Sequence, residues 1–338
     1  MTEAQIPAIT VLMPVYNAAA FVGEAIESIL CQTFTDFEFL IINDGSTDDS
    51  EKIIFGYQDS RIRYIKNESN LRLIATLNKG IELARGKYIA RMDADDISLL
   101  ERLQIQFDFM ERHPEVVLCG SWYEAVGLKS QLVKYVGGHQ QIMLKMLYQC
   151  HLCHPTVVFR KKVVDSFQQK FDRSYLHAED YEFFTRIGET HQLDNIQQVL
   201  LKYRHHVSSV SSSNRQIQFD NSTRIKKHLF SRLGMRVSNR QLEVFRKIAE
   251  HNYEKSMDFV VESRELLEDM FQGNERSCFF DSIFFKRAMA SYWFHVCYNS
   301  TNMGFPVIQA YSNSVIRQYF NPGWLYKFKF FIKALFKI

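Results

Sequence analysis

A short apolar run ends in three carboxylates within four residues at Tyr88-Ile89-Ala90-Arg91-Met92-Asp93-Ala94-Asp95-Asp96. The apolar part predicts a buried strand, so the acids would lie at its carboxyl end, the edge at which open α/β sheets bind ligands. Two carboxylates about 5 Å apart repel each other by ~3 kcal/mol at an effective dielectric constant of about 20, unless a hard cation lies between their oxygens. Taken alone, the stretch is more typical of a solvated acidic turn before a helix than of a binding site.

The hydrophobic pattern on either side of this stretch predicts an α/β fold. Apolar strand patterns recur at residues 8–16, 37–42, 62–65, 116–123, 155–160 and 196–204. Helical spacing follows at 22–30 and 71–85, and a capping box at Ser98-x-x-Glu101 predicts another helix. Strands and helices that alternate with short links predict a Rossmann-like mixed sheet, mostly parallel and flanked by helices.

From about residue 215 the pattern changes to long helical periodicity with few strand signals. We therefore place a domain boundary at the Ser-rich stretch 208–213. The expected organisation is an α/β domain over 1–213, with halves of about 1–100 and 101–213, followed by a helical extension over 214–338.

The last residues of the chain predict a basic amphipathic helix. Its apolar side would carry Phe328, Phe331, Ile332, Leu335 and Ile338, and its other side Lys329, Lys333 and Lys337. Such a helix suits a membrane surface that bears anionic lipid. The alternative is a helix packed on its own domain with solvated lysines.

Composition excludes several classes of protein. A formal net charge of +3 in 338 residues does not by itself indicate a nucleic-acid partner, and we expect none. Neither a signal-peptide pattern nor an apolar run of transmembrane length is present. The six cysteines lack disulfide-framework spacing and are expected to be reduced thiols, which favours a cytoplasmic location.

The familiar phosphate-binding motifs are missing, because neither Gly-x-Gly-x-x-Gly nor Gly-x-x-x-x-Gly-Lys-Ser/Thr occurs. Instead, acidic residues follow two strand ends, at Asp44 and at Asp93 to Asp96. A carboxylate there can accept hydrogen bonds from a base or a ribose, or hold a pyrophosphate through a metal ion. Cys150-His151-Leu152-Cys153-His154 matches a haem-attachment pattern, but without an export signal we interpret the match as coincidence.

Two further groups could contribute chemistry. Glu179 and Asp180 begin a predicted helix, where acids are normal, yet Asp180 could serve as a general base on an alcohol if it faces a cleft. His205 and His206 end a strand, where an imidazole could complete a carboxylate-rich metal site. A surface histidine pair would also be unremarkable.

In order and in spacing, the motifs resemble the family 2 glycosyltransferases, which are inverting enzymes with the GT-A fold. The resemblance covers about residues 8–210. Its motifs are Pro14-Val15-Tyr16-Asn17, Asn43-Asp44-Gly45-Ser46-Thr47-Asp48, Asn78-Lys79-Gly80, the Asp-x-Asp stretch Ala90 to Asp96, His154-Pro155 and Glu179-Asp180. Two positions depart from the family pattern: Arg72 stands where many members have Gly, and Leu77 where many have Arg.

The resemblance implies a role for each matching residue. Nucleotide-sugar contacts would come from Pro14, Tyr16, Asn17, Asp44, Asn78, Asp93 and Ala94. Asp95 would hold Mn²⁺ or Mg²⁺ at the donor diphosphate, with His206, or else His205, as an additional contact. Asp180 would be the catalytic base, and His154 and Glu179 would lie on the acceptor side.

The function that follows is metal-dependent, inverting transfer of a sugar from a nucleoside-diphosphate donor, most commonly UDP, to a hydroxyl of a saccharide or lipid-linked saccharide. Bacterial surface-polysaccharide synthesis is the expected setting. Residues 322–338 would hold the enzyme peripherally on the inner face of the plasma membrane. Two other classes stay open: a glycoside hydrolase with paired carboxylates, and a nucleotide-binding or membrane-scaffold module without chemistry. The hydrolase hypothesis does not explain the expected base-and-ribose pocket around Tyr16 and Asp44.

Overall fold

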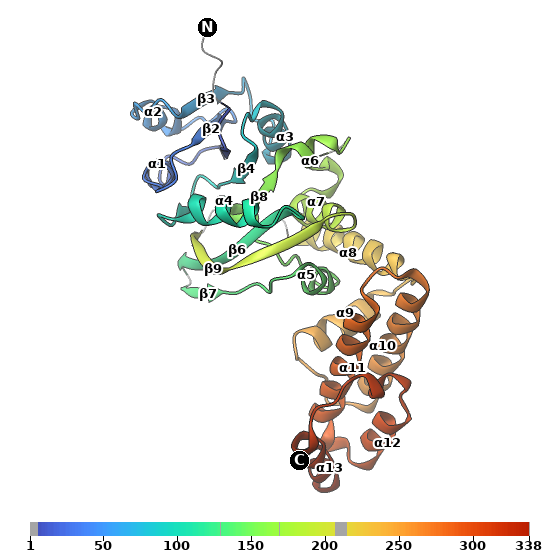
Figure 1. Cartoon of the computed structure of the whole chain (residues 1–338). Helices are drawn as coiled ribbons and strands as arrows, with labels where there is room; N and C mark the ends of the chain where they lie inside the picture. Colours follow the sequence, from blue (N-terminus) through green and yellow to red (C-terminus); the bar gives the residue numbers. More distant parts are fainter. Residues whose placement is uncertain (1–5, 129, 169, 207–214, 338) are drawn as a thin grey trace. The chain divides into compact units, whose positions relative to one another are not determined.

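The computed structural model of the chain describes residues 6–128, 130–168, 170–206 and 215–337 (Figure 1). The chain forms two compact units, one of Met1–Met143 with Cys150–Ser222 and one of Leu144–Gln149 with Thr223–Ile338. The division therefore falls within helix α8 (Arg215–Arg232). The predicted boundary at 208–213 and the predicted apolar residue Ile338 lie outside the described residues.

One sheet organises the first unit, with the strand order β3-β2-β1-β4-β8-β6-β9-β5 and β7 beside β6. Its strands are β1 (Ile9–Val15), β2 (Phe37–Asn43), β3 (Ile62–Lys66), β4 (Tyr88–Arg91), β5 (Ile97–Ser98), β6 (Val116–Gly127), β7 (Gln131–Val133), β8 (Val158–Arg160) and β9 (Gln192–His205). β3, β2, β1 and β4 are mutually parallel, as are β6 and β9, whereas β8 is antiparallel to both β4 and β6. The predicted mixed α/β sheet is confirmed.

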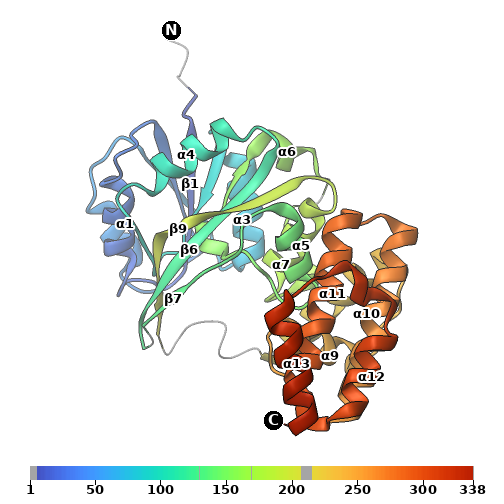
Figure 2. The same ribbon diagram turned by 60° about the horizontal axis from the view of Figure 1, so that its bottom comes forward.

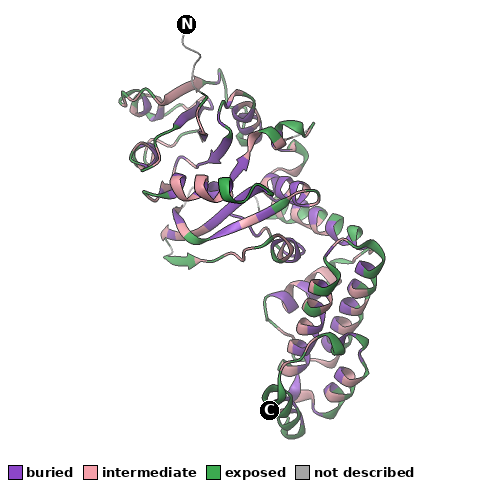
Figure 3. Cartoon of the chain, in the orientation of Figure 1, coloured by how far each residue is buried: buried purple, intermediate pink, exposed green. Residues whose placement is uncertain are grey.

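Helices connect these strands. Those before residue 206 are α1 (Val22–Leu30), α2 (Ser50–Phe55), α3 (Leu73–Leu83), α4 (Arg102–Arg112), α5 (His139–Met146), α6 (Lys161–Ser166) and α7 (Glu179–Gly188). The apolar stripe of α1 is buried, as its spacing predicts. α3 lies close to β1 because Gly80 faces Leu12, and a Cβ at Gly80 would lie 2.3 Å from Leu12 Cδ1. Buried residues follow β1, β2 and β4 (Figure 3).

The predicted capping box at Ser98 is wrong. Ser98 lies in β5, which pairs with β9, and α4 begins only at Arg102 without a side-chain cap. The hydroxyl of Ser98 contacts Met92 Sδ at 3.2 Å instead. Strand pairing with a distant segment, which includes a Leu99 N–H···O=C Leu200 bond of 3.0 Å, replaces the local cap.

The second unit is helical, and the predicted C-terminal helices are confirmed. Beyond α8 it contains α9 (Asn239–Ala249), α10 (Met257–Ser277), α11 (Ser282–Asn299), α12 (Phe305–Asn313) and α13 (Trp324–Phe336). α11 packs against α9, α10 and α12 (Figure 2) and buries Trp293 completely. Across the described ranges, no helix is both long enough and apolar enough to cross a bilayer.

Candidate active site

The carboxyl ends of β1, β2 and β4 form one edge of the sheet. Val15 at the end of β1 is the register partner of Asn43 at the end of β2, and the Asp44 amide donates to Val15 O at 2.8 Å. On the other side of β1, the Met92 amide donates to Leu12 O at 3.0 Å. The loops that carry Tyr16, Asp44 and Asp93 are therefore neighbours, at the edge where parallel sheets bind ligands.

Asp44 and Tyr16 differ in exposure. Asp44 is buried, and its Oδ1 accepts from Asn67 Nδ2 at 2.8 Å and from the Leu71 amide at 2.9 Å. Lys79 Nζ holds the same asparagine, 2.6 Å from Asn67 Oδ1. Tyr16, which follows the half-buried Pro14 at the end of β1, is 49% exposed. A fixed buried carboxylate thus shares the sheet edge with an aromatic ring that is free to stack.

Asn17 links two loops of this edge. It has a φ of +48°, and its side-chain oxygen accepts from the Thr47 amide at 2.8 Å. Its own amide donates to Ser46 Oγ at 3.0 Å, and Ala19 N donates to Asp48 Oδ2 at 2.9 Å. The Asn-Asp-Gly-Ser-Thr-Asp segment and the β1–α1 loop therefore brace each other, and the structure gives Asn17 a loop-fastening contact.

Asn78 was predicted to contact the nucleotide sugar, but its side chain is used elsewhere. Its Nδ2 donates to Phe171 O at 2.9 Å, and its Oδ1 accepts from Phe171 N at 3.0 Å. Since both ends of the amide bond the backbone of one residue, Asn78 fastens the segment ahead of α7 to α3. The structure thus shows a packing contact for Asn78, and its contact with the nucleotide sugar stays a prediction.

The acidic stretch after β4 gathers its carboxylates. Asp93, Asp95 and Asp96 each offer an oxygen within 4.8 Å of the others. His206 Nε2 lies 2.8 Å from Asp95 Oδ2. Asp96 is buried; its Oδ1 accepts from the Arg204 amide at 2.8 Å, and its Oδ2 is buried without a hydrogen-bond partner. Carboxylate oxygens with an imidazole make a donor set that suits a divalent cation.

The electrostatics of the cluster favour a positive ligand. Burial, together with the charges of Asp93 and Asp95, raises the pKa of Asp96 well above its ordinary value. Burial also raises the pKa of Asp93, against the opposing effect of Arg91 and with a further increase from Asp95. Burial and mutual repulsion disfavour the ionised form of these carboxyl groups, and a cation placed among them would stabilise that form.

Three arginines support the cluster, and none of them was predicted to be a site residue. Arg91 is buried and ion-paired with Asp93, and its Nε is buried without a partner. Arg102 is almost completely buried, and its guanidinium donates to Arg91 O at 2.6 Å and to Ser98 Oγ at 3.0 Å. Arg204 Nε donates to the backbone oxygen of Asp95 at 2.9 Å. An arginine within an otherwise apolar strand is a usable signal for Arg91; the positions of Arg102 and Arg204 depend on tertiary packing.

Asp180 lies in the first turn of α7 and is half-buried. Its Oδ1 accepts from the Tyr181 amide at 2.7 Å. Burial raises the pKa of Asp180, while hydrogen bonding to Tyr181 and the charge of Arg91 oppose the increase. The charge of Asp180 in turn contributes to the raised pKa of Asp93, so α7 and the end of β4 face one region of the first unit.

Glu179 is buried and His154 is half-buried beside this region. Burial, followed by the charge of Asp180, raises the pKa of Glu179 to about 7, and its Oε2 has no hydrogen-bond partner. Burial lowers the pKa of His154 well below its ordinary value, so the ring is neutral near pH 7. His154 Nε2 is buried and unpartnered, while the ring lies 5.4 Å from Phe171. Both residues therefore hold polar atoms that a bound hydroxyl could satisfy.

The two histidines at the end of β9 contact different residues. His206 reaches Asp95, as described above, and its ring lies 4.9 Å from that of Phe21. The ring of His205 lies 5.0 Å from Tyr203, and its backbone oxygen accepts from Leu128 N at 3.1 Å. Of the two, His206 is the histidine that joins the acidic cluster.

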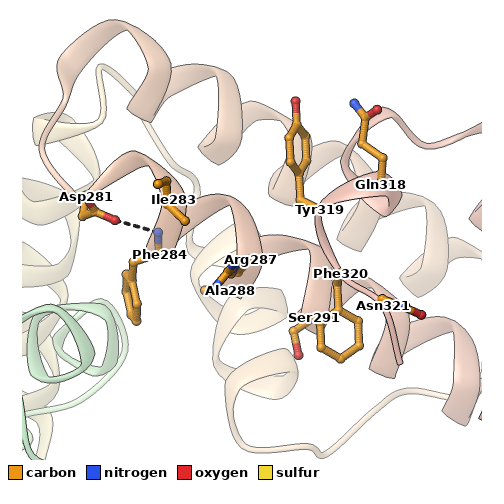
Figure 4. Close-up of a pocket in the computed structure, with 10 residues that line it drawn as sticks. All are labelled: Asp281, Ile283, Phe284, Arg287, Ala288, Ser291, Gln318, Tyr319, Phe320 and Asn321. Atoms are coloured by element: carbon orange, nitrogen blue, oxygen red, sulfur yellow. Dashed lines mark hydrogen bonds between the residues drawn. The ribbon is translucent and has the colours of Figure 1, made fainter. Parts of the chain in front are cut away.

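A hollow of about 800 Å³ lies in the helical unit and not in the unit that carries the acidic cluster (Figure 4). It is formed by the start of α11 and by the turn Val315–Tyr319, with Phe284, Tyr319 and Phe320 among its lining residues. Asp281 at its rim accepts from the Phe284 amide at 2.7 Å, which is an ordinary N-cap. None of the predicted site residues lines it, so its volume does not identify the reaction centre.

Known proteins of one family are similar to this chain. The family model described as glycosyl transferase family 2 matches residues 10–167. An uncharacterised glycosyltransferase of Methanocaldococcus jannaschii is 37% identical over 207 residues, which make up 59% of this chain and 71% of that protein. The Escherichia coli protein WfgD, a UDP-Glc:alpha-D-GlcNAc-diphosphoundecaprenol beta-1,3-glucosyltransferase, is 29% identical over 61% of this chain and 80% of its own length.

A solved structure shares the fold. S. aureus TarS 1-349, crystallised in complex with UDP-GlcNAc, superimposes with a TM-score of 0.57 over 90% of this chain and 91% of that one. The sequence identity is 16%, so this likeness concerns the fold.

Proposed function

This chain belongs to the family 2 glycosyltransferases, and we propose that it transfers a sugar from a nucleoside-diphosphate donor to a hydroxyl group with inversion at the anomeric carbon. One observation carries the proposal. A stacking ring at Tyr16, a buried carboxylate at Asp44 and the cluster of Asp93, Asp95 and Asp96 share a single sheet edge. A donor made of base, ribose, diphosphate and sugar needs this combination of groups.

The donor is proposed to lie along that edge. Tyr16 and Pro14 would contact the base. The Asp44 carboxylate, fixed by Asn67, would accept from the base or ribose with its Oδ2, which makes no hydrogen bond within the described part of the chain. Asp93 and Ala94 would border the donor sugar. A UDP-sugar is the first candidate, because WfgD uses UDP-Glc and the TarS complex contains UDP-GlcNAc.

The residues present fit a divalent cation, Mn²⁺ or Mg²⁺. Asp95 and His206 would hold it, with Asp93 and Asp96 close enough to contribute. The unpartnered buried Oδ2 of Asp96 and the raised pKa values in the cluster are the features that a cation would relieve. When bound, such an ion neutralises negative charge on the diphosphate.

Asp180 is proposed as the base. Its carboxylate would accept the proton of the acceptor hydroxyl as that oxygen bonds to the anomeric carbon and the bond to the diphosphate oxygen breaks. The raised pKa of Asp180 favours this proton transfer. His154 and Glu179, with their unpartnered buried atoms, would orient the acceptor. The displacement needs no protein nucleophile, so the anomeric configuration inverts.

The acceptor is proposed to be a saccharide or lipid-linked saccharide of a bacterial surface polysaccharide. WfgD, whose name specifies a diphosphoundecaprenol-linked acceptor, supports this choice. A lipid-linked acceptor would place the reaction at the inner face of the plasma membrane, with residues 322–338 on its surface.

The direct test is a screen of nucleotide sugars with Mn²⁺ or Mg²⁺ that scores release of nucleoside diphosphate in the presence of lipid-linked saccharides. Release that requires both donor and acceptor is expected. A glycoside hydrolase would instead release sugar from a saccharide without any nucleotide sugar. A binding module would bind a nucleotide without turnover of any donor. Either result would contradict the proposal.

Metal dependence is tested through donor binding, which calorimetry measures without turnover. Asp95→Ala should abolish the increase in UDP affinity that Mn²⁺ gives the wild-type protein, because the substitution removes the oxygen nearest His206. The matched control is Asp36→Ala, an exposed aspartate between α1 and β2. Unchanged manganese-supported binding in Asp95→Ala would remove this residue from the metal site.

A further inference from the structure

Helix α13 is held to the helical unit by one narrow face. Only Phe330 and Ala334 of this helix are buried. The ring of Phe330 lies 5.4 Å from Tyr311 and 6.1 Å from Phe294. These contacts fix the rotation of α13 about its axis, and therefore which side chains face outward.

The side of α13 that faces outward is apolar. Its exposed residues include Trp324 at 78%, Leu335 at 72%, Phe336 at 64% and Phe328 at 58% exposure, with Leu325, Phe331 and Ile332 also exposed. At 100° per residue, Trp324, Phe328, Ile332 and Leu335 fall on one stripe. A helix on the surface of a soluble protein normally turns such a stripe inward. Here the stripe remains uncovered (Figure 3).

The exposed side chain of Phe305, near the carboxyl end of α13, extends this apolar surface. Gly304 lies against the stem of Lys337, since a Cβ there would be 3.1 Å from Lys337 Cε. Phe305, the next residue, is 72% exposed. The apolar surface therefore continues from the carboxyl end of α13 to the start of α12.

Positive charge borders the apolar stripe. Residues 322–338 include four lysines (Lys327, Lys329, Lys333 and Lys337) and no acidic residue. Lys333 Nζ lies 4.8 Å over the ring of Tyr298. Within the part of the chain that the structure describes, none of the four has a carboxylate partner. Two copies of this surface packed together would bring eight ammonium groups into proximity, which disfavours a second copy as the occupant.

We propose that the uncovered face of α13, together with Phe305, docks the helical unit on a membrane surface rich in anionic lipid. The apolar side chains enter the interfacial region, the lysines contact lipid phosphates, and Trp324 and Tyr326 lie at the headgroup level. Because Phe330 and Ala334 already hold the helix, the surface is preformed. The inference deepens the proposed function, on which it rests for the lipid anchor of the acceptor.

The test uses the full chain and vesicle flotation. Wild-type protein should float with vesicles of phosphatidylcholine and phosphatidylglycerol, bind pure phosphatidylcholine weakly, and be released by high salt. Phe328→Ser combined with Leu335→Ser should lower vesicle affinity at least about tenfold, and so should Lys327→Gln combined with Lys329→Gln. The matched control, Ile283→Ser with Val315→Ser, removes two exposed apolar residues of the same unit and should bind like wild type.

Several results would overturn the proposal. These are a wild-type protein that does not float, an equal loss in the control variant, or a dimer in the absence of lipid that the Phe328/Leu335 variant abolishes. Thermal melting checks that each variant is folded, and the exposed positions predict unchanged Tm. UDP binding measured on the same samples separates this inference from the proposed function. A wild-type protein that binds the donor but not the vesicles would refute the docking surface alone, whereas a wild-type protein that binds the vesicles but not the donor would refute the transferase proposal alone.

Discussion

Arg72 holds a backbone conformation that a residue with a Cβ rarely adopts. Its φ and ψ are +69° and 162°, immediately before the first turn of α3. The turn is kept by the Arg72 amide, which donates to Asn70 Oδ1 at 2.8 Å, and by Thr76 N, which donates to Arg72 O at 3.1 Å. Glycine adopts this geometry without strain, which agrees with the glycine in the family pattern that this chain resembles.

We predict that Arg72→Gly stabilises the protein. Relief of about 1–3 kcal/mol of strain outweighs the extra conformational entropy of glycine, about 0.5–1 kcal/mol, so the free energy of unfolding should rise by about 1 kcal/mol. Arg72→Ala, which keeps a Cβ, is the matched control and should show no such gain. Urea unfolding of the three proteins gives the comparison, and an Arg72→Gly protein no more stable than Arg72→Ala would contradict the strain.

Single residues of the candidate site were predictable to different degrees. The acids after β4 stood out by their place at a predicted strand end, and the order of the other motifs, rather than the stretch alone, made them a candidate site. Asn78 belonged to the same motif pattern, yet its contacts with Phe171 could not be foreseen, since its partner lies 93 residues away. The buried Arg102 gave no signal, because its hydrogen bond to Arg91 O exists only after α4 packs on the sheet, where it contacts β6 and β9.

At the scale of elements, the start of β4 depends on the absence of a side chain. A Cβ at Gly86 would lie 2.3 Å from Thr10 N and 2.6 Å from Ile9 C, both backbone atoms of β1. The Gly86 amide also donates to Thr10 Oγ1 at 2.8 Å. The chain must pass close to β1 at Gly86 so that β4, which follows, brings Asp93 beside the end of β1.

Gly86→Ala should therefore destabilise the protein by about 1–3 kcal/mol or more, because strand backbone cannot rotate away as a side chain can. Gly23→Ala is the contrasting substitution. In α1 its Cβ would meet no atom closer than 3.4 Å, so it should be neutral or slightly stabilising. Chemical unfolding measures both variants. Equal stabilities of the two variants would contradict the close approach of Gly86 to the backbone of Ile9 and Thr10.

Elements with strong periodicity were predictable, and short elements that depend on a partner were not. β1, β2 and β4 are predominantly apolar runs, which is the pattern of buried parallel strands. β5 has two residues and exists only through its pairing with β9. The false cap at Ser98 has the same origin, since a local motif was outweighed by a contact between distant segments.

At the scale of the whole molecule, the change from mixed to helical periodicity near residue 215 identified the class of both parts. The sequence pattern also identified α13 as amphipathic. It could not say which side of the helix faces the protein, because this depends on Phe330 and Ala334 finding partners on α11 and α12. That rotation leaves an apolar surface uncovered on an otherwise ordinary helical unit.

The central claim is that Asp180 deprotonates the acceptor during transfer from a nucleotide sugar. The most direct test is the rate of acceptor-dependent nucleoside-diphosphate release by Asp180→Asn at saturating donor. Asp165→Asn, which changes an exposed carboxylate on α6, is the control. We predict that Asp180→Asn lowers turnover at least ~10²-fold while donor affinity, measured by calorimetry, stays near that of wild type and the control remains active. Near-normal turnover by Asp180→Asn would contradict the mechanism.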